Sequence, residues 1–414
     1  MSKILRNKLK YYYKKDLYHL YRFIIPKGTS NLILNNTNIT SKRKYEYLVL
    51  DNIIGKTDDI QYLLSRLKAN CSGDTKLVIS YYNHLWEPIL KLASLLGIRE
   101  KDVSQNWLNN DDIANLLYLS GYDVITKQKR LLLPIYLPFI SRFVNTWIAP
   151  LPLINNFCLT TWVIATPILK QSKELSASIV VAAKNEEGNI PKIIPRIPKF
   201  CKKIEVIFVE GNSSDMTWDA IQKEIKKTHK NVTSISAFKQ KGKGKGDAVR
   251  LGFSKAKGDI LMILDADMTM PPEDLPKFYG AIISGKGEFI NGSRLVYPMD
   301  RLAMQFLNKI GNRTFSLLFT WILGQRFTDT LCGTKVIKAK HYKLITKNRR
   351  FFGDFDPFGD FDLIFGAVKQ NLKVVEIPVR YKERVYGSTN ISRVKHALLL
   401  FRMTWMAYRK FKAW

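Results

Sequence analysis

The stretch Ile260-Leu-Met-Ile-Leu-Asp265-Ala-Asp267 places two aspartates directly after an apolar run. The apolar residues predict a buried strand from Asp259 to Leu264. Because side chains alternate along an extended chain, Asp265 and Asp267 project from one face and can share a cation. Carboxylate oxygens at this spacing suit Mg²⁺ or Mn²⁺. Taken alone, the pair is equally well explained as a solvated strand end.

Three earlier apolar runs have the same design. They predict strands at 177–182, 205–209 and 232–237, separated by helical patterns. This alternation is typical of an α/β fold with a mostly parallel sheet. Ligand sites in such sheets form beyond the carboxyl ends of the strands, so the polar clusters that follow each run are candidates for chemistry.

Two of these clusters carry carboxylates and amides. Residues 183–190 contain Asn185 and Glu186, and the second cluster begins at Glu210. Such groups supply the directional hydrogen bonds that a nucleotide base and ribose require. The alternative is that they cap the following helices, which is partly true of Asn189 and of residues 213–215.

A third cluster, Lys241-Gly-Lys-Gly-Lys-Gly-Asp-Ala248, precedes a predicted helix. Glycine lets backbone amides approach an anion, and a helix N-terminus adds partial positive charge, so a diphosphate could bind here. A flexible turn is the simpler alternative. Arg294, at the end of a later strand, could grip a phosphate bidentately.

Seven motifs in this order resemble the family-2 glycosyltransferases, most closely the polyprenyl-phosphate (dolichyl-phosphate-mannose-synthase-like) branch. The motifs are ASIVVAAKNEEGNI (177–190), IEVIFVEGNSSDMTWD (204–219), KGKGDAVRLGF (243–253), GDILMILDADMTMPPEDL (258–275), NGSR (291–294), DTLCGTK (329–335) and EIPVRYKERVYGSTN (376–390). The resemblance covers roughly residues 176–390. It implies a GT-A fold, Rossmann-like with a mostly parallel sheet, and an inverting, metal-dependent transfer of a hexose from a nucleoside diphosphate sugar.

The resemblance also implies a role for individual residues. The nucleotide-sugar would contact Ala183, Asn185, Glu186, Glu210, Lys245, Asp247 and Asp265. Asp265 and Asp267 would hold Mg²⁺ or Mn²⁺. Phosphates of the donor or acceptor would be steadied by Arg294, Arg384 and Ser388, and Arg294 is also a catalytic candidate. The acidic residue near the acceptor would be Asp362, with Asp360 and Asp329 as rivals.

One motif departs from the family pattern. The family's second strand usually ends in Val-Asp-Asp-Gly-Ser, whereas this chain has Val-Glu-Gly-Asn-Ser at 209–213. Glu210 stands where the family has its first aspartate, so this carboxylate is on a longer side chain, and Gly211 stands where the family has its second aspartate. The choice between UDP and GDP therefore stays open.

The acceptor decides whether a general base is needed. A lipid phosphate is largely ionised at neutral pH, since its second pKa is about 6 by analogy with phosphoamino acids, and needs no strong base. A sugar hydroxyl would need Asp362 or a neighbour to take its proton. We expect the acceptor to be polyprenyl (undecaprenyl) phosphate at the cytoplasmic membrane face. A glycan hydroxyl in cell-surface polysaccharide synthesis is the alternative, and a non-catalytic membrane-binding protein on a degenerate transferase fold is a third possibility.

The part from 45 to 170 predicts a smaller α/β domain. Its text YEYLVLDNIIGKTDDIQYLLSRL (45–67), LVISYYNHLWEPILKLASLLGI (77–98) and NWLNNDDIANLLYLSGYDVI (106–125) resembles the later half of a class I S-adenosylmethionine methyltransferase. The glycine-rich turn of that family is missing before Tyr45. We therefore expect a truncated remnant without methyltransferase activity that serves as a scaffold or docks on a membrane.

The charge balance points to an anionic partner. Lys and Arg number 66 against 35 Asp and Glu, a formal net charge of +31. Nucleic acid, an acidic membrane surface and phosphate-bearing substrates are the candidates, and no nucleic-acid motif supports the first. A lysine-rich surface without a specific partner is the simpler alternative. The four scattered cysteines fit a reducing cytosol better than zinc or disulfides.

Three segments complete the predicted organisation. Residues 1–44 form a basic N-terminal segment without the apolar core of a signal peptide. Residues 143–169 carry no charge, and we expect two short apolar helices that lie on or beside a membrane, with a single membrane span as the alternative. After the transferase part, 171–390, residues 391–414 form a basic amphipathic helix. Its apolar face, Leu398, Phe401, Trp405 and Tyr408, could lie among lipid headgroups or close the transferase core.

Overall fold

The computed structural model describes residues 2–37, 43–100, 105–169, 174–297, 306–349, 359–382, 384, 386 and 393–414. The chain divides into two compact units. The N-terminal unit comprises residues 1–169 together with 407–414, and the C-terminal unit comprises residues 170–406.

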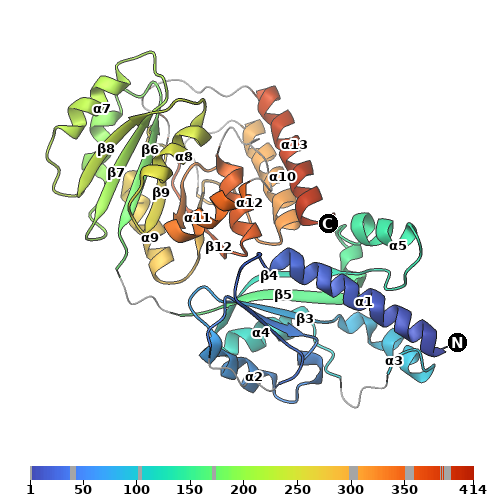
Figure 1. The fold of residues 1–414 in the computed structure, drawn as a ribbon. Coiled ribbons are helices and arrows are strands. Elements are labelled where there is room, and N and C mark those ends of the chain that lie inside the picture. Colours follow the sequence, from blue (N-terminus) through green and yellow to red (C-terminus); the bar gives the residue numbers. More distant parts are fainter. Residues whose placement is uncertain are drawn as a thin grey trace. The chain divides into compact units, whose positions relative to one another are not determined.

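A seven-stranded sheet forms the centre of the C-terminal unit (Figure 1). Its order is β12-β10-β11-β9-β6-β7-β8. The strands are β6 (Ala177–Ala183), β7 (Ile204–Glu210), β8 (Ser234–Lys239), β9 (Ile260–Asp265), β10 (Phe289–Ser293), β11 (Lys335–Lys338) and β12 (Val374–Pro378). Neighbours pair in parallel except at β11, which is antiparallel to both β9 and β10. The predicted α/β fold with a mostly parallel sheet is confirmed.

The four strands predicted from apolar runs lie within two residues of the observed bounds. The side chains of β6, β7 and β9 are mostly buried because helices cover the sheet, and Val181, Phe208 and Leu264 each have 0% exposure. The edge strand β8 is only partly buried. The helices are α6 (Ile190–Ile193), α7 (Thr217–Ile225), α8 (Lys245–Lys255), α9 (Leu275–Ile283), α10 (Phe306–Leu323), α11 (Ala339–Lys347), α12 (Asp360–Lys369) and α13 (Arg393–Phe411). Burial on both faces explains why β6, β7 and β9 are nearly continuous apolar runs.

The N-terminal unit has its own five-stranded sheet, in the order β1-β2-β3-β5-β4. The strands are β1 (Asn31–Leu34), β2 (Tyr47–Asp51), β3 (Lys76–Tyr82), β4 (Tyr122–Arg130) and β5 (Thr160–Pro167). The helices are α1 (Ser2–Ile24), α2 (Ile60–Leu67), α3 (Glu87–Leu95), α4 (Asn110–Leu119) and α5 (Ile140–Phe143). The first three strands are parallel, and β5 runs antiparallel to both β3 and β4. This unit is also α/β, and its likeness to a methyltransferase stays a prediction.

The uncharged segment 143–169 differs from its prediction. Two short helical segments occupy 144–148 and 154–157, but Thr160–Pro167 is the fully buried strand β5, which the prediction of two helices did not include. A short run rich in Thr, Val and Ile suits a strand that is covered on both faces, and periodicity alone cannot separate such a strand from a buried helix. Within the described residues, no helix combines the length and the apolar composition needed to cross a bilayer.

Residues from both ends of the chain belong to the N-terminal unit. Helix α1 lies in the basic N-terminal segment, 1–44, and buries Leu17, Leu20, Tyr21 and Ile24 at helical spacing. At the other end, Trp414 stacks on Phe23 with ring centroids 4.0 Å apart. On α13 the predicted apolar face is split: Leu398, Phe401 and Trp405 are exposed, whereas Tyr408 is buried.

Candidate active site

The carboxyl ends of β6, β7 and β9 meet at one edge of the C-terminal sheet. In the ladders, Ala183 pairs with Glu210, and Ala182 pairs with Asp265. The segments that follow these three strands therefore begin side by side. This arrangement brings together the predicted nucleotide-binding residues after β6 and β7 and the aspartate pair after β9.

Lys245 holds the first aspartate. Its Nζ lies 2.5 Å from Oδ1 of Asp265, and both side chains keep about a quarter of their surface exposed, at 30% and 26%. Lys245 is the first residue of α8. Burial alone would raise the pKa of Asp265, but the charge and hydrogen bond of Lys245 outweigh it, so the pKa lies below its ordinary value. Asp265 is therefore an ionised carboxylate at neutral pH, beside the positive end of a helix.

Arg384 holds the second aspartate. Its Nη2 donates to Oδ2 of Asp267 at 2.8 Å, and its Nη1 lies 3.5 Å from Oε1 of Glu186. The other carboxylate oxygen of Asp267 accepts bonds from the backbone and hydroxyl of Thr269. Arg384 thus bridges the loop after β6 and the aspartate after β9. Ser388, which was predicted together with Arg384 to bind a phosphate, lies outside the described residues.

The loops after β6 and β7 are tied together by the residues that were predicted to bind a nucleotide. Asn185, at φ +56°, accepts a bond from the backbone of Ser214, and the Glu210 carboxylate accepts one from the backbone of Ser213. Burial raises the pKa of Glu186, although a bond from Asn189 and the charge of Arg384 act the other way. Asp215 caps α7 through Thr217, so the capping alternative holds for part of this cluster.

Two further residues that were predicted to contact the nucleotide-sugar, Ala183 and Asp247, make local hydrogen bonds at the strand and loop ends. The carbonyl of Ala183 accepts a bond from the backbone of Gly211. Asp247 accepts one from the backbone of Gly242 at 3.2 Å, which closes the glycine-lysine loop before α8. Gly246, in the first turn of α8, packs against the backbone of Gly359: a Cβ atom added at Gly246 would lie 2.8 Å from the Gly359 nitrogen. This close approach positions the start of α12 beside the start of α8.

Arg294 and Asp329 form a buried bidentate pair. Nε and Nη2 of Arg294 donate to the two carboxylate oxygens of Asp329 at 2.6 and 2.8 Å. Asp329 is fully buried and also accepts bonds from Asn312 and from the backbone of Leu331. Burial would raise the pKa of Asp329, but the Arg294 charge holds it below the ordinary value. With its oxygens already bonded, Asp329 is better placed to fix Arg294 than to accept a proton from a substrate.

The other two acidic candidates lie in the first turn of α12. Asp360 is buried and pairs with the buried Lys335 at 3.0 Å. Asp362 accepts a bond from Arg349 at 3.0 Å and lies 3.8 Å from Arg250. These last three side chains line a small cavity of about 30 Å³. Asp362 is therefore the predicted acid that lines this cavity.

A basic pocket near the same edge was missed in the sequence. Its volume is about 330 Å³, and it is lined by Pro271, Asp274, Lys277, Tyr297, Arg380 and Lys382. The backbone of Lys382 donates to the carbonyl of Thr269, which follows the aspartate pair. The signal was the alternation of basic residues at 380, 382 and 384, which places them on one side of an extended chain.

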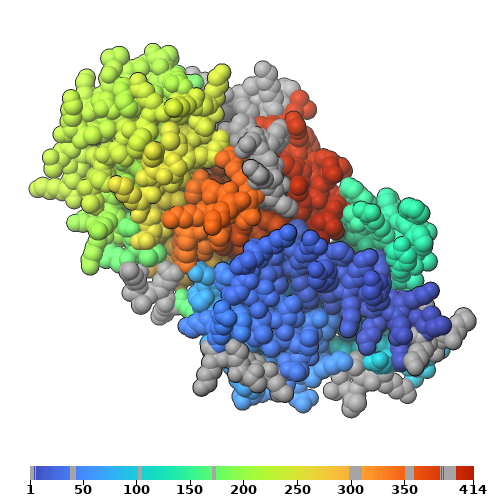
Figure 2. Space-filling model, in the orientation of Figure 1, coloured from blue at the N-terminus to red at the C-terminus, as the bar shows by residue number. Residues whose placement is uncertain are grey.

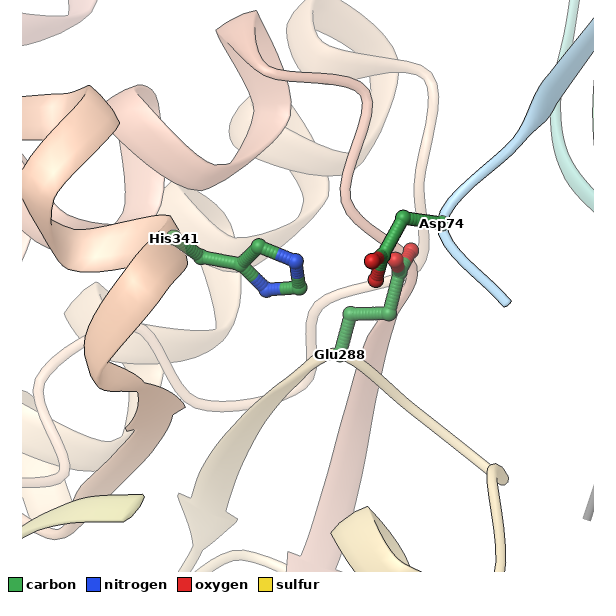
Figure 3. A group of neighbouring side chains, drawn as sticks. All are labelled: Asp74, Glu288 and His341. Carbon is green, nitrogen blue, oxygen red and sulfur yellow. The ribbon is translucent and has the colours of Figure 1, made fainter. Parts of the chain in front are cut away.

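The aspartate pair fits a divalent cation by the chemistry of its donors. Both side chains are partly exposed, at 26% and 12% for Asp265 and Asp267, and both offer hard oxygen ligands. Another carboxylate, Glu288, lies at the opposite edge of the sheet, directly before β10. Its ligand atom and that of His341 are within 4.8 Å of each other (Figure 3). Two ligands are too few for a metal centre, and Asp74, also drawn there, belongs to the N-terminal unit.

Gly333→Ala is expected to lower activity by about 100-fold, because misplacing catalytic groups by roughly 1 Å can have that effect. A Cβ atom at this position would overlap Oδ2 of Asp265 and Nζ of Lys245. The test compares this variant with a control variant by steady-state kinetics and thermal unfolding. The control is Gly280→Ala in α9, where nothing lies within 4 Å: it should keep activity and gain about 0.5–1 kcal/mol of stability. Equal activity of the two variants would contradict the assigned role of the Lys245–Asp265 pair.

Acidic, amide and basic groups gathered at the carboxyl ends of its parallel strands place this unit in the class of α/β proteins that bind ligands at this edge of the sheet. Within this class, residues 178–351 match the family model of glycosyl transferase family 2. This part of the chain is a family-2 glycosyltransferase domain, so the predicted enzyme family and its GT-A fold are confirmed.

Relatives share this part of the chain. The undecaprenyl-phosphate 4-deoxy-4-formamido-L-arabinose transferase of Pectobacterium atrosepticum is 24% identical over 232 residues, which cover 55% of this chain and 65% of the relative. The protein of the same name from Salmonella newport is 25% identical over 241 residues, or 57% of this chain and 67% of the relative. Among solved structures, glucosyl-3-phosphoglycerate synthase from Mycobacterium tuberculosis has a TM-score of 0.41 at 15% identity, covering 57% of this chain and 80% of that one. The chain thus spans about two thirds of the length of the curated relatives.

Proposed function

We propose that the protein transfers a sugar, with inversion, from a nucleoside diphosphate sugar to a polyprenyl phosphate at the cytoplasmic face of the membrane. The observation that carries this proposal is the aspartate pair after β9, held between Lys245 and Arg384 at the nucleotide edge of a family-2 domain. The names of the relatives, which specify undecaprenyl phosphate, support the choice of acceptor.

The donor would lie along the edge formed by β6, β7 and β9. Asn185, Glu186 and Glu210 belong to the two loops that would receive the base and ribose. The diphosphate would then reach the N-terminus of α8, where Lys245 and the helix dipole add positive charge. Lys245 can exchange its bond to Asp265 for one to a phosphate oxygen, since both partners are oxyanions.

Asp265 and Asp267 would hold a divalent cation against the diphosphate. A bound Mg²⁺ or Mn²⁺ supplies Lewis-acid neutralisation of the negative charge that develops on the leaving diphosphate. The protein's own contribution is to fix the two carboxylates: Thr269 orients Asp267, and the β9 ladder orients Asp265. Arg384 can then move from Asp267 to a phosphate, as predicted for it from the sequence.

The acceptor phosphate would enter the basic pocket lined by Lys277, Arg380 and Lys382. Three cations in a pocket of about 330 Å³ offer a dianion both charge and room. The pocket's one carboxylate, Asp274, is already bonded to Lys277 at 2.6 Å. A phosphate oxygen that is already ionised can attack the anomeric carbon without transferring a proton to the enzyme.

The experiment that tests this function is a product assay on undecaprenyl phosphate with Mn²⁺. The donors are a panel of nucleoside diphosphate sugars that includes the derivative of 4-deoxy-4-formamido-L-arabinose, the sugar in the relatives' names. Sugar in the lipid product would support the proposal. Transfer only to glycan acceptors would favour the hydroxyl alternative, and no turnover of any donor would favour a non-catalytic binding protein.

Asp362→Asn is expected to keep transfer to a lipid phosphate within about threefold of wild type, because no general base is required. If the acceptor is a hydroxyl, loss of the base should lower kcat by about 10²–10⁴-fold. The measurement is kcat for the lipid acceptor with wild type and variant at neutral pH. The matched control is Asp360→Asn, which breaks the buried pair with Lys335 and should show itself in thermal unfolding.

A further inference from the structure

A second pocket lies entirely within the N-terminal unit. Its volume is about 480 Å³, in the range of ligand-binding sites. Tyr82 ends β3 and Asn52 directly follows β2, and both line the pocket. It therefore lies beyond the carboxyl ends of two parallel strands, which is where open α/β sheets bind ligands. Helices α1 and α3 supply two of the other walls, and residues 98–100, 105 and 134–135 contribute to the rest.

The walls of this pocket are mostly hydrocarbon. They include Leu9, Ile89, Leu90, Ala93, Ile135 and Leu159. The same apolar character continues onto the surface of α3, none of whose residues is fully buried. Ile89 is 53% exposed, and Leu92, one turn farther along, is 56% exposed. A ligand that covered such side chains would gain about 25 cal/mol for each Å² of apolar surface removed from water.

The polar lining of the pocket is cationic. Arg6, Lys10, Lys56 and Arg99 line it, with Glu100 as its one acidic residue. Glu100 lies 3.7 Å from Lys10, so its charge is largely offset. The Arg99 guanidinium lies over the ring of Tyr82, 5.4 Å from its centroid. This charge balance favours an anionic ligand and disfavours a cationic one such as the sulfonium of S-adenosylmethionine.

We propose that this pocket binds the hydrocarbon chain of a lipid with a phosphate head. The apolar walls would take a section of an isoprenoid or acyl chain, and the four cations would hold the phosphate. The inference concerns the N-terminal unit alone and goes beyond the proposed sugar transfer. It assigns a ligand to a domain whose sequence predicted no more than a scaffold or a membrane-docking piece. It also explains why α3 keeps an apolar face uncovered.

The test is calorimetric titration of the full chain, without metal or sugar donor, using three probes. Farnesyl phosphate should bind at least about ten times more tightly than farnesol, which has the chain without the charge, and than pyrophosphate, which has the charge without the chain. Lysophosphatidylglycerol, with one acyl chain and a phosphate, identifies the source. Binding equal to that of farnesyl phosphate indicates a membrane phospholipid, and much weaker binding indicates an isoprenoid phosphate.

Two variants probe the pocket itself. Ala93→Trp should fill it and weaken farnesyl phosphate binding by about tenfold or more, while Arg99→Gln should weaken farnesyl phosphate but not farnesol. Arg142→Gln, an exposed arginine on α5 outside the pocket, is the matched control and should change nothing. Thermal unfolding verifies that each variant is folded.

The proposal would be overturned if wild-type protein did not bind farnesyl phosphate, or if both pocket variants bound it as tightly as wild type. Asp267→Asn separates this inference from the proposed function, because that variant should lose sugar transfer and still bind farnesyl phosphate.

Discussion

Replacing Asp267 with asparagine is expected to lower kcat/KM for sugar transfer by about 10³-fold, which corresponds to roughly 4 kcal/mol of transition-state stabilisation. The substitution keeps the size of the side chain and removes its charge. A neutral amide is a poor ligand for a divalent cation compared with a carboxylate. It also loses the ion pair with Arg384, whose Nη2 lies 2.8 Å from the carboxylate. Kinetics with saturating Mn²⁺ and the best donor measure the effect.

The matched control is Asp219→Asn, which makes the same chemical change at an exposed position on α7. It should leave kcat/KM within about twofold of wild type, since substitutions at exposed positions away from special contacts usually have small effects. If Asp267→Asn retains more than a tenth of wild-type activity, the carboxylate is not a ligand that the reaction requires.

Replacing Asp329 with asparagine is expected to destabilise the C-terminal unit by about 3–5 kcal/mol, because it leaves the buried Arg294 without its counter-charge. Arg294 and Asp329 are 11% and 0% exposed in their side chains. Both guanidinium donors of Arg294 that face Asp329 would meet an amide that can accept at only one atom. Urea unfolding followed by circular dichroism gives the free energy of unfolding.

The chain offers a control with the same geometry at the surface. Arg196 donates to both carboxylate oxygens of Glu273 at 2.7 and 2.9 Å, but these side chains are 34% and 50% exposed. Glu273→Gln should cost no more than about 1 kcal/mol, since water screens an exposed pair. Equal losses for the two variants would show that burial does not set the value of the Arg294–Asp329 pair.

Acid should narrow the difference in unfolding free energy between wild type and Asp329→Asn. The folded-state pKa of Asp329 is lowered, so the stability that its charge contributes is present above the ordinary aspartate pKa, about 3.9, and is lost as the pH falls through the folded value. Unfolding free energies of both proteins at pH 7, 5 and 3 make the comparison. A gap that stays constant down to pH 3 would mean that the carboxylate charge is not responsible.

The strands and the aspartate pair could be predicted because each depends on a local pattern. A buried parallel strand needs an uninterrupted apolar run, and the alternation of an extended chain fixes the face of Asp265 relative to Asp267. The prediction for segment 160–167 was wrong because its local pattern does not specify one structure. Its apolar residues are compatible with a buried helix or a buried strand, and only its partners β3 and β4 decide between them.

The role of Asp329 depends on contacts that local sequence does not encode. Its partner Arg294 is 35 residues away, and Asn312, on α10, lies between them in the sequence. Ion pairing of this kind follows from how β10, α10 and the segment before β11 pack. The pocket at Arg380 and Lys382 also depends on tertiary packing and was not predicted from the sequence. The alternation of these two basic residues around Tyr381 did indicate that they share one side of an extended chain.

Binding of Mn²⁺ together with a nucleoside diphosphate at Asp265 and Asp267 can be measured most directly by electron paramagnetic resonance of the metal. When wild-type protein and UDP or GDP are added to Mn²⁺, the signal of free Mn²⁺ should broaden and diminish. When the Asp267→Asn variant is added instead, the signal should stay close to its value in buffer that contains the nucleotide alone. If the variant binds Mn²⁺ and nucleotide as tightly as wild type, the two carboxylates at the end of β9 do not form the metal site of this enzyme.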